Sequence, residues 1–93
     1  MKLKGLFKRL EDLNRAKVFF YGEQDEIQFD IYIDGSRVGK FSTYDEVMDY
    51  FHMTYTIEFC AKLINLNLNR ERDNWWLGHI ELNGKAYGVE VYF

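Results

Sequence analysis

The chain has 93 residues, of which 47% are apolar and 18% aromatic, and fifteen Asp and Glu outweigh twelve Lys and Arg to give a net charge of −3. This length fits one domain with one core, and this apolar content excludes a disordered chain. Residues 1–17 hold six basic and two acidic side chains, for +4, which leaves −7 for residues 18–93. A basic N-terminal segment thus precedes an acidic body.

The single cysteine, Cys60, excludes an intramolecular disulfide, on which small secreted domains usually depend. The basic N-terminal segment has no unbroken apolar stretch of the kind found in signal peptides, and no run approaches the roughly 18 apolar residues of a transmembrane helix. We therefore expect one cytoplasmic domain without a membrane partner.

The first predicted element is an amphipathic helix over residues 2–16. Its apolar residues recur at helical spacing within an arc of about 120°. Lys8 with Asp12, and Glu11 with Arg15, stand four residues apart and can pair along the polar side. We expect the helix to pack on a sheet; a nucleic-acid arm and a membrane-surface helix are the alternatives. The apolar stripe comprises Leu3, Leu6, Phe7, Leu10 and Leu13.

The pattern changes at Val18 to a short apolar run that ends at Tyr21, and a polar stretch follows over residues 22–26. Apolar and polar residues then alternate with a period of two, which predicts a strand. The residues of its apolar face are Ile27, Phe29, Ile31 and Ile33.

Asp34-Gly35 predicts a turn, after which residues 37–41 return as the second strand of a hairpin. A two-residue loop pairs Ile31 with Val38. A three-residue loop instead pairs Phe29 with Phe41 and Asp30 with Lys40. We favour the two-residue loop.

A central helix is predicted to begin at Thr43, because Glu46 three residues later completes a capping box. The apolar stripes before and after residues 54–56 lie on nearly opposite sides of a straight helix. We therefore predict a kink or break there, with the helix resuming to about Leu63. A strand over this segment is the alternative.

The last predicted element is a hairpin, from Trp75 to Leu82 and from Lys85 to Phe93, around Asn83-Gly84. This dipeptide favours a type I′ turn, which places Leu82 opposite Lys85. Trp75 then lies opposite Tyr92 on the outer face. The predicted core face comprises Trp76, Ile80, Leu82, Tyr87, Val89 and Val91.

Together these elements predict one α+β domain over residues 1–93: an antiparallel sheet of about five strands, an N-terminal amphipathic helix, and one kinked or paired central helix.

No pattern in the sequence predicts catalysis. His52 and Cys60 are eight residues apart, about 12 Å along a continuous helix, which is too far for a thiolate and imidazole pair. His79, Glu81 and Glu90 share the outer face of the terminal hairpin, but no nucleophile or phosphate-binding loop accompanies them. We expect no enzymatic activity, metal or cofactor.

Acidic and aromatic side chains are the candidates for partner binding. Acids speed association with a basic partner, and aromatic residues supply the buried contact. Trp75 and Tyr92 form a second candidate patch, which could also bind another copy of the chain. The predicted binding residues are Tyr21, Asp30, Tyr32, Asp34, Asp45, Asp49, Trp75 and Tyr92.

These features predict a non-catalytic protein-binding module whose acidic and aromatic surface occupies a basic site on a larger, nucleic-acid-handling protein. Direct nucleic-acid binding through the basic helix is the alternative, although the acidic pI of about 5.3 opposes it. In size and charge alone, the chain resembles small phage and mobile-element inhibitors, including anti-CRISPR proteins. That resemblance implies an inhibitor, and no motif carries it.

Overall fold

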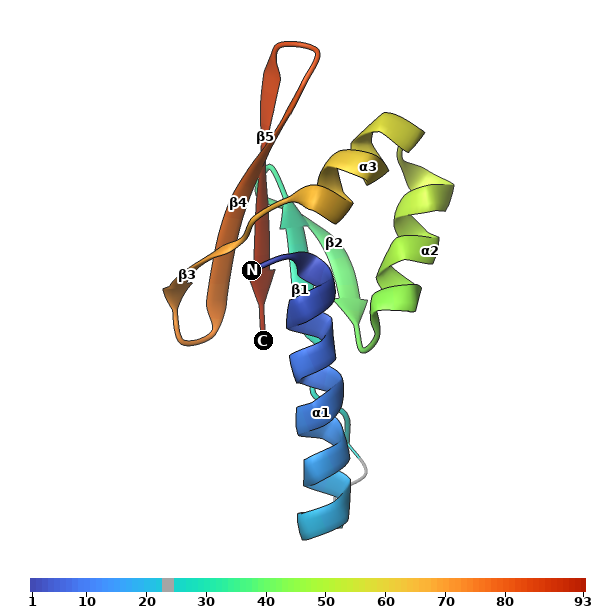
Figure 1. Cartoon of the computed structure of the whole chain (residues 1–93), viewed down its shortest axis with the longest axis vertical. Coiled ribbons are helices and arrows are strands. Elements are labelled where there is room, and N and C mark those ends of the chain that lie inside the picture. The colour runs from blue at the N-terminus through green and yellow to red at the C-terminus, as the bar shows by residue number, and fades with distance from the viewer. Residues whose placement is uncertain (23–24) are drawn as a thin grey trace.

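The structure is a computed structural model that describes residues 1–22 and 25–93. Three helices pack on one face of a five-stranded antiparallel sheet with the strand order β2-β1-β5-β4-β3, which confirms the predicted α+β class (Figure 1). The helices are α1 (Leu3–Tyr21), α2 (Tyr44–Thr54) and α3 (Ile57–Asn65). The strands are β1 (Phe29–Ile33), β2 (Ser36–Phe41), β3 (Asn69–Arg72), β4 (Trp75–Leu82) and β5 (Lys85–Tyr92).

Helix α1 is longer than predicted. It ends at Tyr21 because Gly22 adopts a left-handed conformation (φ 64°) and its N–H donates to the Val18 carbonyl at 3.0 Å. The predicted stripe is buried over the first turns of the helix, but Leu13 is half-exposed. On the polar side Arg15 pairs with Asp12 at 3.3 Å instead of Glu11.

Asn14 fastens the second half of α1 to the segment that enters β1. Its amide Nδ2 donates to the Ile27 carbonyl at 3.0 Å, and its Oδ1 accepts from the Ile27 N–H at 2.8 Å. These two bonds satisfy the backbone of Ile27, which the alternation placed in the strand but which precedes β1.

The β1–β2 hairpin combines both predicted registers. Its turn has two residues, Asp34 and Gly35, with positive φ values of 51° and 78°. A bulge then shifts the pairing by one residue, so Ile31 lies opposite Gly39 and the favoured pairing with Val38 is wrong. Beyond the bulge the strands have the register predicted for the longer loop, with Phe29 opposite Phe41 and Asp30 opposite Lys40.

The bulge has a packing reason. Residues three apart in a regular strand point to opposite faces of the sheet, so Val38 and Phe41 could not both face the helices. One extra residue changes that parity. Phe41 is buried, and Val38 packs against the same core.

The break in the central helix is confirmed. Thr43 caps α2 by accepting from the Glu46 N–H at 3.2 Å, and the Glu46 carboxylate accepts from Ser42 N–H at 3.1 Å. Helix α2 ends at Thr54, and Thr56 caps α3 by accepting from the Phe59 N–H at 3.2 Å. A strand over this segment is therefore wrong.

The β4–β5 hairpin has the predicted register, with Leu82 opposite Lys85 and Trp75 opposite Tyr92. Strand β3 was not predicted; it pairs with β4 and forms one edge of the sheet. The segment that connects α3 to β3 crosses β4 closely at Gly78, where glycine leaves room for it. A Cβ at this position would lie 3.0 Å from the Asn67 carbonyl oxygen.

Candidate interaction surfaces

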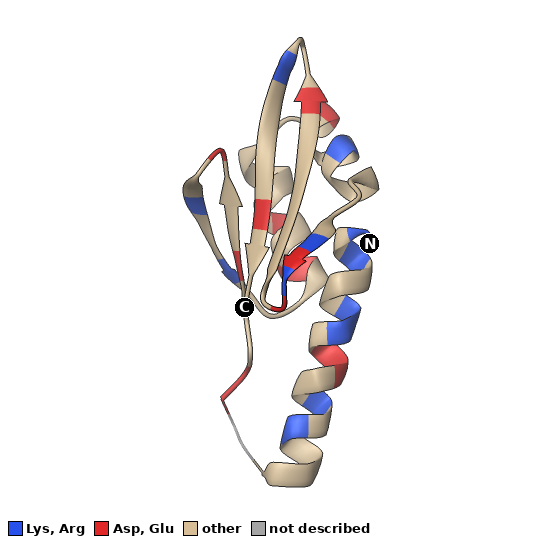
Figure 2. Cartoon of the chain, turned by 90° about the vertical axis from the view of Figure 1, so that its left-hand side faces the viewer, with Lys and Arg blue, Asp and Glu red and all other residues tan. Residues whose placement is uncertain are grey.

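The face of the sheet opposite the helices carries a cluster of aromatic rings. Figure 2 views the molecule from this side. The rings of Trp75 and Tyr92 stack nearly parallel, with centroids 5.9 Å apart and an interplanar angle of 4°. Tyr32 on β1 meets the Tyr92 ring edge-on at 5.5 Å. The structure thus brings together three predicted aromatic residues from three adjacent strands, hereafter the aromatic face.

Glu90 holds this aromatic face in place. Its carboxylate oxygen Oε2 accepts hydrogen bonds from Trp75 Nε1 at 3.1 Å and from the Tyr92 hydroxyl. The bond from the hydroxyl, reinforced by burial, raises the pKa of Tyr92 to about 12. Since both bonds end on one oxygen, the other carboxylate oxygen is able to accept from a partner.

Two of the predicted acids already have partners within the chain. Asp30 accepts from Arg37 Nε at 2.8 Å, and this bond raises the pKa of Arg37. Asp34 accepts from the Gly88 N–H at 2.8 Å, and its second oxygen lies 3.5 Å from Lys85 Nζ. These pairings partly compensate the charges of Asp30 and Asp34, so the two residues contribute less negative charge to the surface than the sequence predicts.

The remaining predicted residues lie elsewhere. Asp45 and Asp49 are exposed on α2, in the helical layer, and Asp45 lines a cavity of about 280 Å³ together with Lys4 and Lys8 of α1. Tyr21 is exposed at the end of α1, away from Tyr32 (Figure 1). The predicted acidic surface is therefore divided between two layers.

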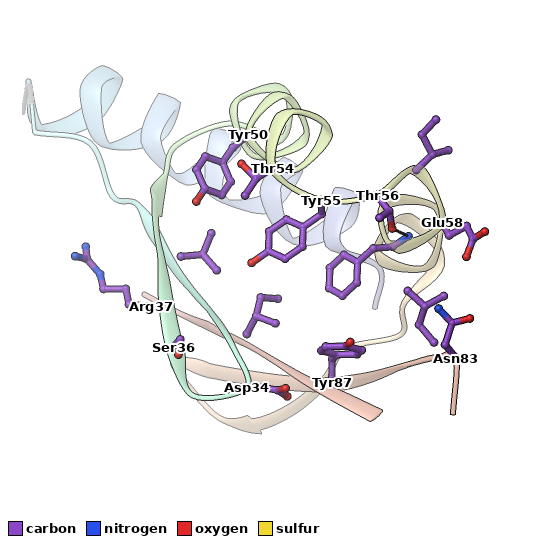
Figure 3. A pocket seen from close by; sticks show the side chains of 15 residues that line it. Asp34, Ser36, Arg37, Tyr50, Thr54, Tyr55, Thr56, Glu58, Asn83 and Tyr87 are labelled. Carbon is purple, nitrogen blue, oxygen red and sulfur yellow. Dashed lines mark hydrogen bonds between the residues drawn. The ribbon is translucent and has the colours of Figure 1, made fainter. Parts of the chain in front are cut away.

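The structure also contains a groove that sequence patterns did not predict. It has a volume of about 830 Å³ and lies between the α2–α3 corner and the turns of both hairpins (Figure 3). Its apolar and aromatic lining comprises Ile33, Val38, Tyr50, Tyr55, Phe59, Leu82 and Tyr87.

Stacked rings form one wall of this groove. Tyr55 stacks against both Phe51 and Phe59, with centroid distances of 4.9 and 4.7 Å, and the two phenylalanine rings lie 6.4 Å apart. Phe59 meets Tyr87 of β5 edge-on at 5.6 Å. Partial burial raises the pKa of Tyr55, and its hydroxyl points into the groove (Figure 3).

Local sequence patterns do not predict the groove, because its lining comes from separate segments. Tyr50 follows no predicted stripe, Tyr55 stands in the predicted break, and Tyr87 was assigned to the core. The seven tyrosines of this short chain were the available signal, because tyrosine is enriched where one end of a side chain is apolar and the other is wet.

The groups considered for catalysis lie in different environments. Cys60 is buried, and burial raises its pKa, which opposes thiolate formation. His79 is exposed, while Glu90 is bonded to Trp75 and Tyr92. In the described part of the chain, no three His, Cys, Asp or Glu side chains are grouped to hold a metal ion.

Among residues 1–22 and 25–93, no helix combines the length and apolarity needed to cross a membrane. Comparisons with protein-family models, with curated proteins and with solved structures found no match for this chain.

Proposed function

We propose that the protein is a non-catalytic protein-binding module whose aromatic face binds a basic segment of a larger protein. The observation that carries this proposal is the stack of Trp75 on Tyr92, fixed by two hydrogen bonds to Glu90. Rings held in place before binding lose little entropy when a partner docks, and Trp and Tyr dominate the energetics of many interfaces.

The chemistry of this face suits an arginine or lysine side chain. A cation is attracted to the face of an aromatic ring, and the second carboxylate oxygen of Glu90 offers an acceptor beside the rings. Asp30 can exchange its pairing with Arg37 for a partner cation, because an exposed ion pair contributes only about 0–1 kcal/mol.

The edges of the sheet are less suited to binding. Strand β3 is four residues long, has an exposed residue at each position, and carries Arg70, Glu71 and Arg72. Short charged edges oppose the addition of another strand. Strand β2 is interrupted by its bulge. A partner is therefore expected on the face of the sheet and not at its edge.

We further propose that the partner handles nucleic acids and that binding inhibits it. The acidic body, with a net charge of −7 over residues 18–93, is complementary in charge to a basic site that binds nucleic acid. A partner so bound would lose access to its own nucleic acid, and competition between the protein and labelled DNA or RNA for that partner tests this step.

The proposal is tested by titrating the isotope-labelled protein with an arginine-rich peptide and, separately, with single-stranded DNA at low salt. The indole N–H of Trp75 is a direct NMR reporter. We expect the peptide to shift this signal and the amides of Tyr32 and Tyr92. Absence of these shifts would exclude the aromatic face, and DNA-induced shifts confined to α1 would favour the nucleic-acid alternative.

Two charge reversals supply a matched control. Asp30→Lys changes the charge beside the aromatic face, whereas Asp49→Lys makes the same change in the helical layer. We expect Asp30→Lys to weaken peptide binding about tenfold, or 1.4 kcal/mol, and Asp49→Lys to have a much smaller effect. Equal losses in the two variants would show attraction by overall charge and count against a local site.

A further inference from the structure

The last turn of α1 exposes large apolar side chains to solvent. Phe19, Phe20 and Tyr21 are 82, 72 and 77% exposed, and Val18 is half-exposed beside them. Three aromatic residues exposed to this degree present on the order of 500 Å² of surface. Soluble monomers rarely leave so large an apolar patch without a binding role.

The arrangement of these residues restricts what can cover them. Successive helical residues advance by about 100°, so Val18, Phe19, Phe20 and Tyr21 point in four directions around the helix axis. A flat surface covers only one side of a helix. We call residues Val18–Tyr21 the α1 tip. Because this helix end is apolar all round, it requires a concave receptor.

The chain itself contains a receptor of this kind. The groove between α2, α3 and the hairpin turns is lined by apolar and aromatic side chains, and its 830 Å³ lies within the range of about 300–1,000 Å³ typical of binding pockets. Figure 1 places the end of α1 and the α2–α3 corner that lines the groove toward opposite ends of the longest dimension, which is 48 Å. One copy therefore cannot place its own tip in its own groove.

We propose that two copies associate in antiparallel orientation, each inserting its α1 tip into the groove of the other. Each contact would bury about 500 Å² of tip in addition to the groove surface it covers, so two contacts would bury more than about 1,000 Å², the area expected of a specific interface. A pair of tips packed side by side would bury only one side of each. The reciprocal arrangement also closes, so it stops at two copies.

Charge supports a second copy as the occupant. An antiparallel pair lays the basic segment of one copy, at +4, along the acidic body of the other, at −7. Asp25 and Glu26 follow the tip closely in the sequence and are exposed. These two acids oppose insertion of the tip into an anionic bilayer, which selects for basic flanks.

Cysteine cross-linking tests the contact directly. Ile57 at the groove is 86% exposed, so Phe20→Cys with Ile57→Cys leaves the core intact. Under mild oxidation we expect a disulfide between chains. In the matched control, Phe20→Cys with Met53→Cys, the second position is 88% exposed on α2 but does not line the groove. Equal cross-linking of the two pairs, or dimers from Phe20→Cys alone, would overturn the tip-in-groove contact.

Sedimentation equilibrium from micromolar to millimolar concentration measures the association itself. We expect twice the monomer mass at the upper end, and at least tenfold weaker association for Phe19→Ser with Phe20→Ser, two exposed positions whose change spares the fold. A monomer at every concentration, or association with anionic vesicles in place of self-association, would overturn the proposal. Peptide binding by the aromatic face is unaffected by either result, so the two proposals fail independently.

Discussion

At the scale of single residues, Glu90 has the most consequential role. Its spacing from His79 and Glu81 suggested an acid and base cluster, but its carboxylate is instead an acceptor that orders two rings. Sequence alone predicts the face on which Glu90 lies, because alternation and the Asn83-Gly84 turn fix the register. It does not predict which neighbour the carboxylate bonds.

Replacing Glu90 with Gln tests this role. The negative charge that stabilises the protonated hydroxyl is removed, so we expect the pKa of Tyr92 to fall from about 12 toward its ordinary value of 10.0. An NMR titration of the Tyr92 ring measures the change. Glu81→Gln is the control, because it removes a negative charge from the same face of the sheet without touching the Tyr92 ring. If the pKa of Tyr92 fell equally in both variants, a long-range charge effect would explain its shift and the bond would not.

The same bond predicts how stability depends on alkaline pH. The pKa of Tyr92 is raised in the folded state, so the unfolded chain loses this proton first, near pH 10. The stabilisation is fully present below that pH and is lost as the pH rises through about 12. Urea unfolding of the wild type and of Glu90→Gln should therefore converge in stability across this window, and a constant difference between them would contradict the assignment.

At the scale of elements, the close crossing at Gly78 is open to test. A Cβ there would meet the Asn67 carbonyl oxygen at 3.0 Å, so we expect Gly78→Ala to destabilise the fold by about 1–3 kcal/mol through overpacking. Gly88 lies on the neighbouring strand, and a Cβ there would meet nothing within 4 Å. Gly88→Ala is the control and should be nearly neutral in urea unfolding. Similar losses in the two variants would point to strand flexibility instead of the crossing.

Elements with local signals could be predicted from the sequence. Asn83-Gly84 determines the terminal hairpin, and Thr43 with Glu46 marks the start of α2. The cap of α3 at Thr56 was not predicted. Three features have no such signal. The end of α1 is apolar all round and shows no stripe, β3 is charged and shows no alternation, and the bulge at Val38 satisfies packing between distant segments.

At the scale of the whole molecule, the projecting end of α1 enlarges the domain. The Cα radius of gyration is 13.7 Å, whereas a compact chain of this length has about 12 Å. X-ray scattering extrapolated to zero concentration, where self-association does not contribute, should give a value near the larger one. A value near 12 Å would mean that the α1 tip folds back on the body in solution.

The candidate sites could be predicted only in part. Trp75 and Tyr92 meet because the register of a hairpin is a local property. Tyr32 joins them only through the long-range pairing of β1 with β5, which local patterns do not predict. Asp45 and Asp49 are separated from these residues because they lie on α2, in the helical layer. The sequence predicts this helix but does not show on which side of the sheet it packs. The groove depends on the angle between α2 and α3, which arises from packing over the whole core.

The strand order has a consequence for folding. Strand β5, the last of the described strands to be synthesised, lies at the centre of the sheet, and its Val91 pairs with Ile31 of β1, sixty residues earlier. Pairing over such a separation slows folding, because the chain entropy of closing a long loop is lost before the contact forms. During synthesis, β1 and β2 must therefore wait with their apolar face uncovered until β5 has been made and can pair, which makes this interval the one in which a chaperone has most to bind.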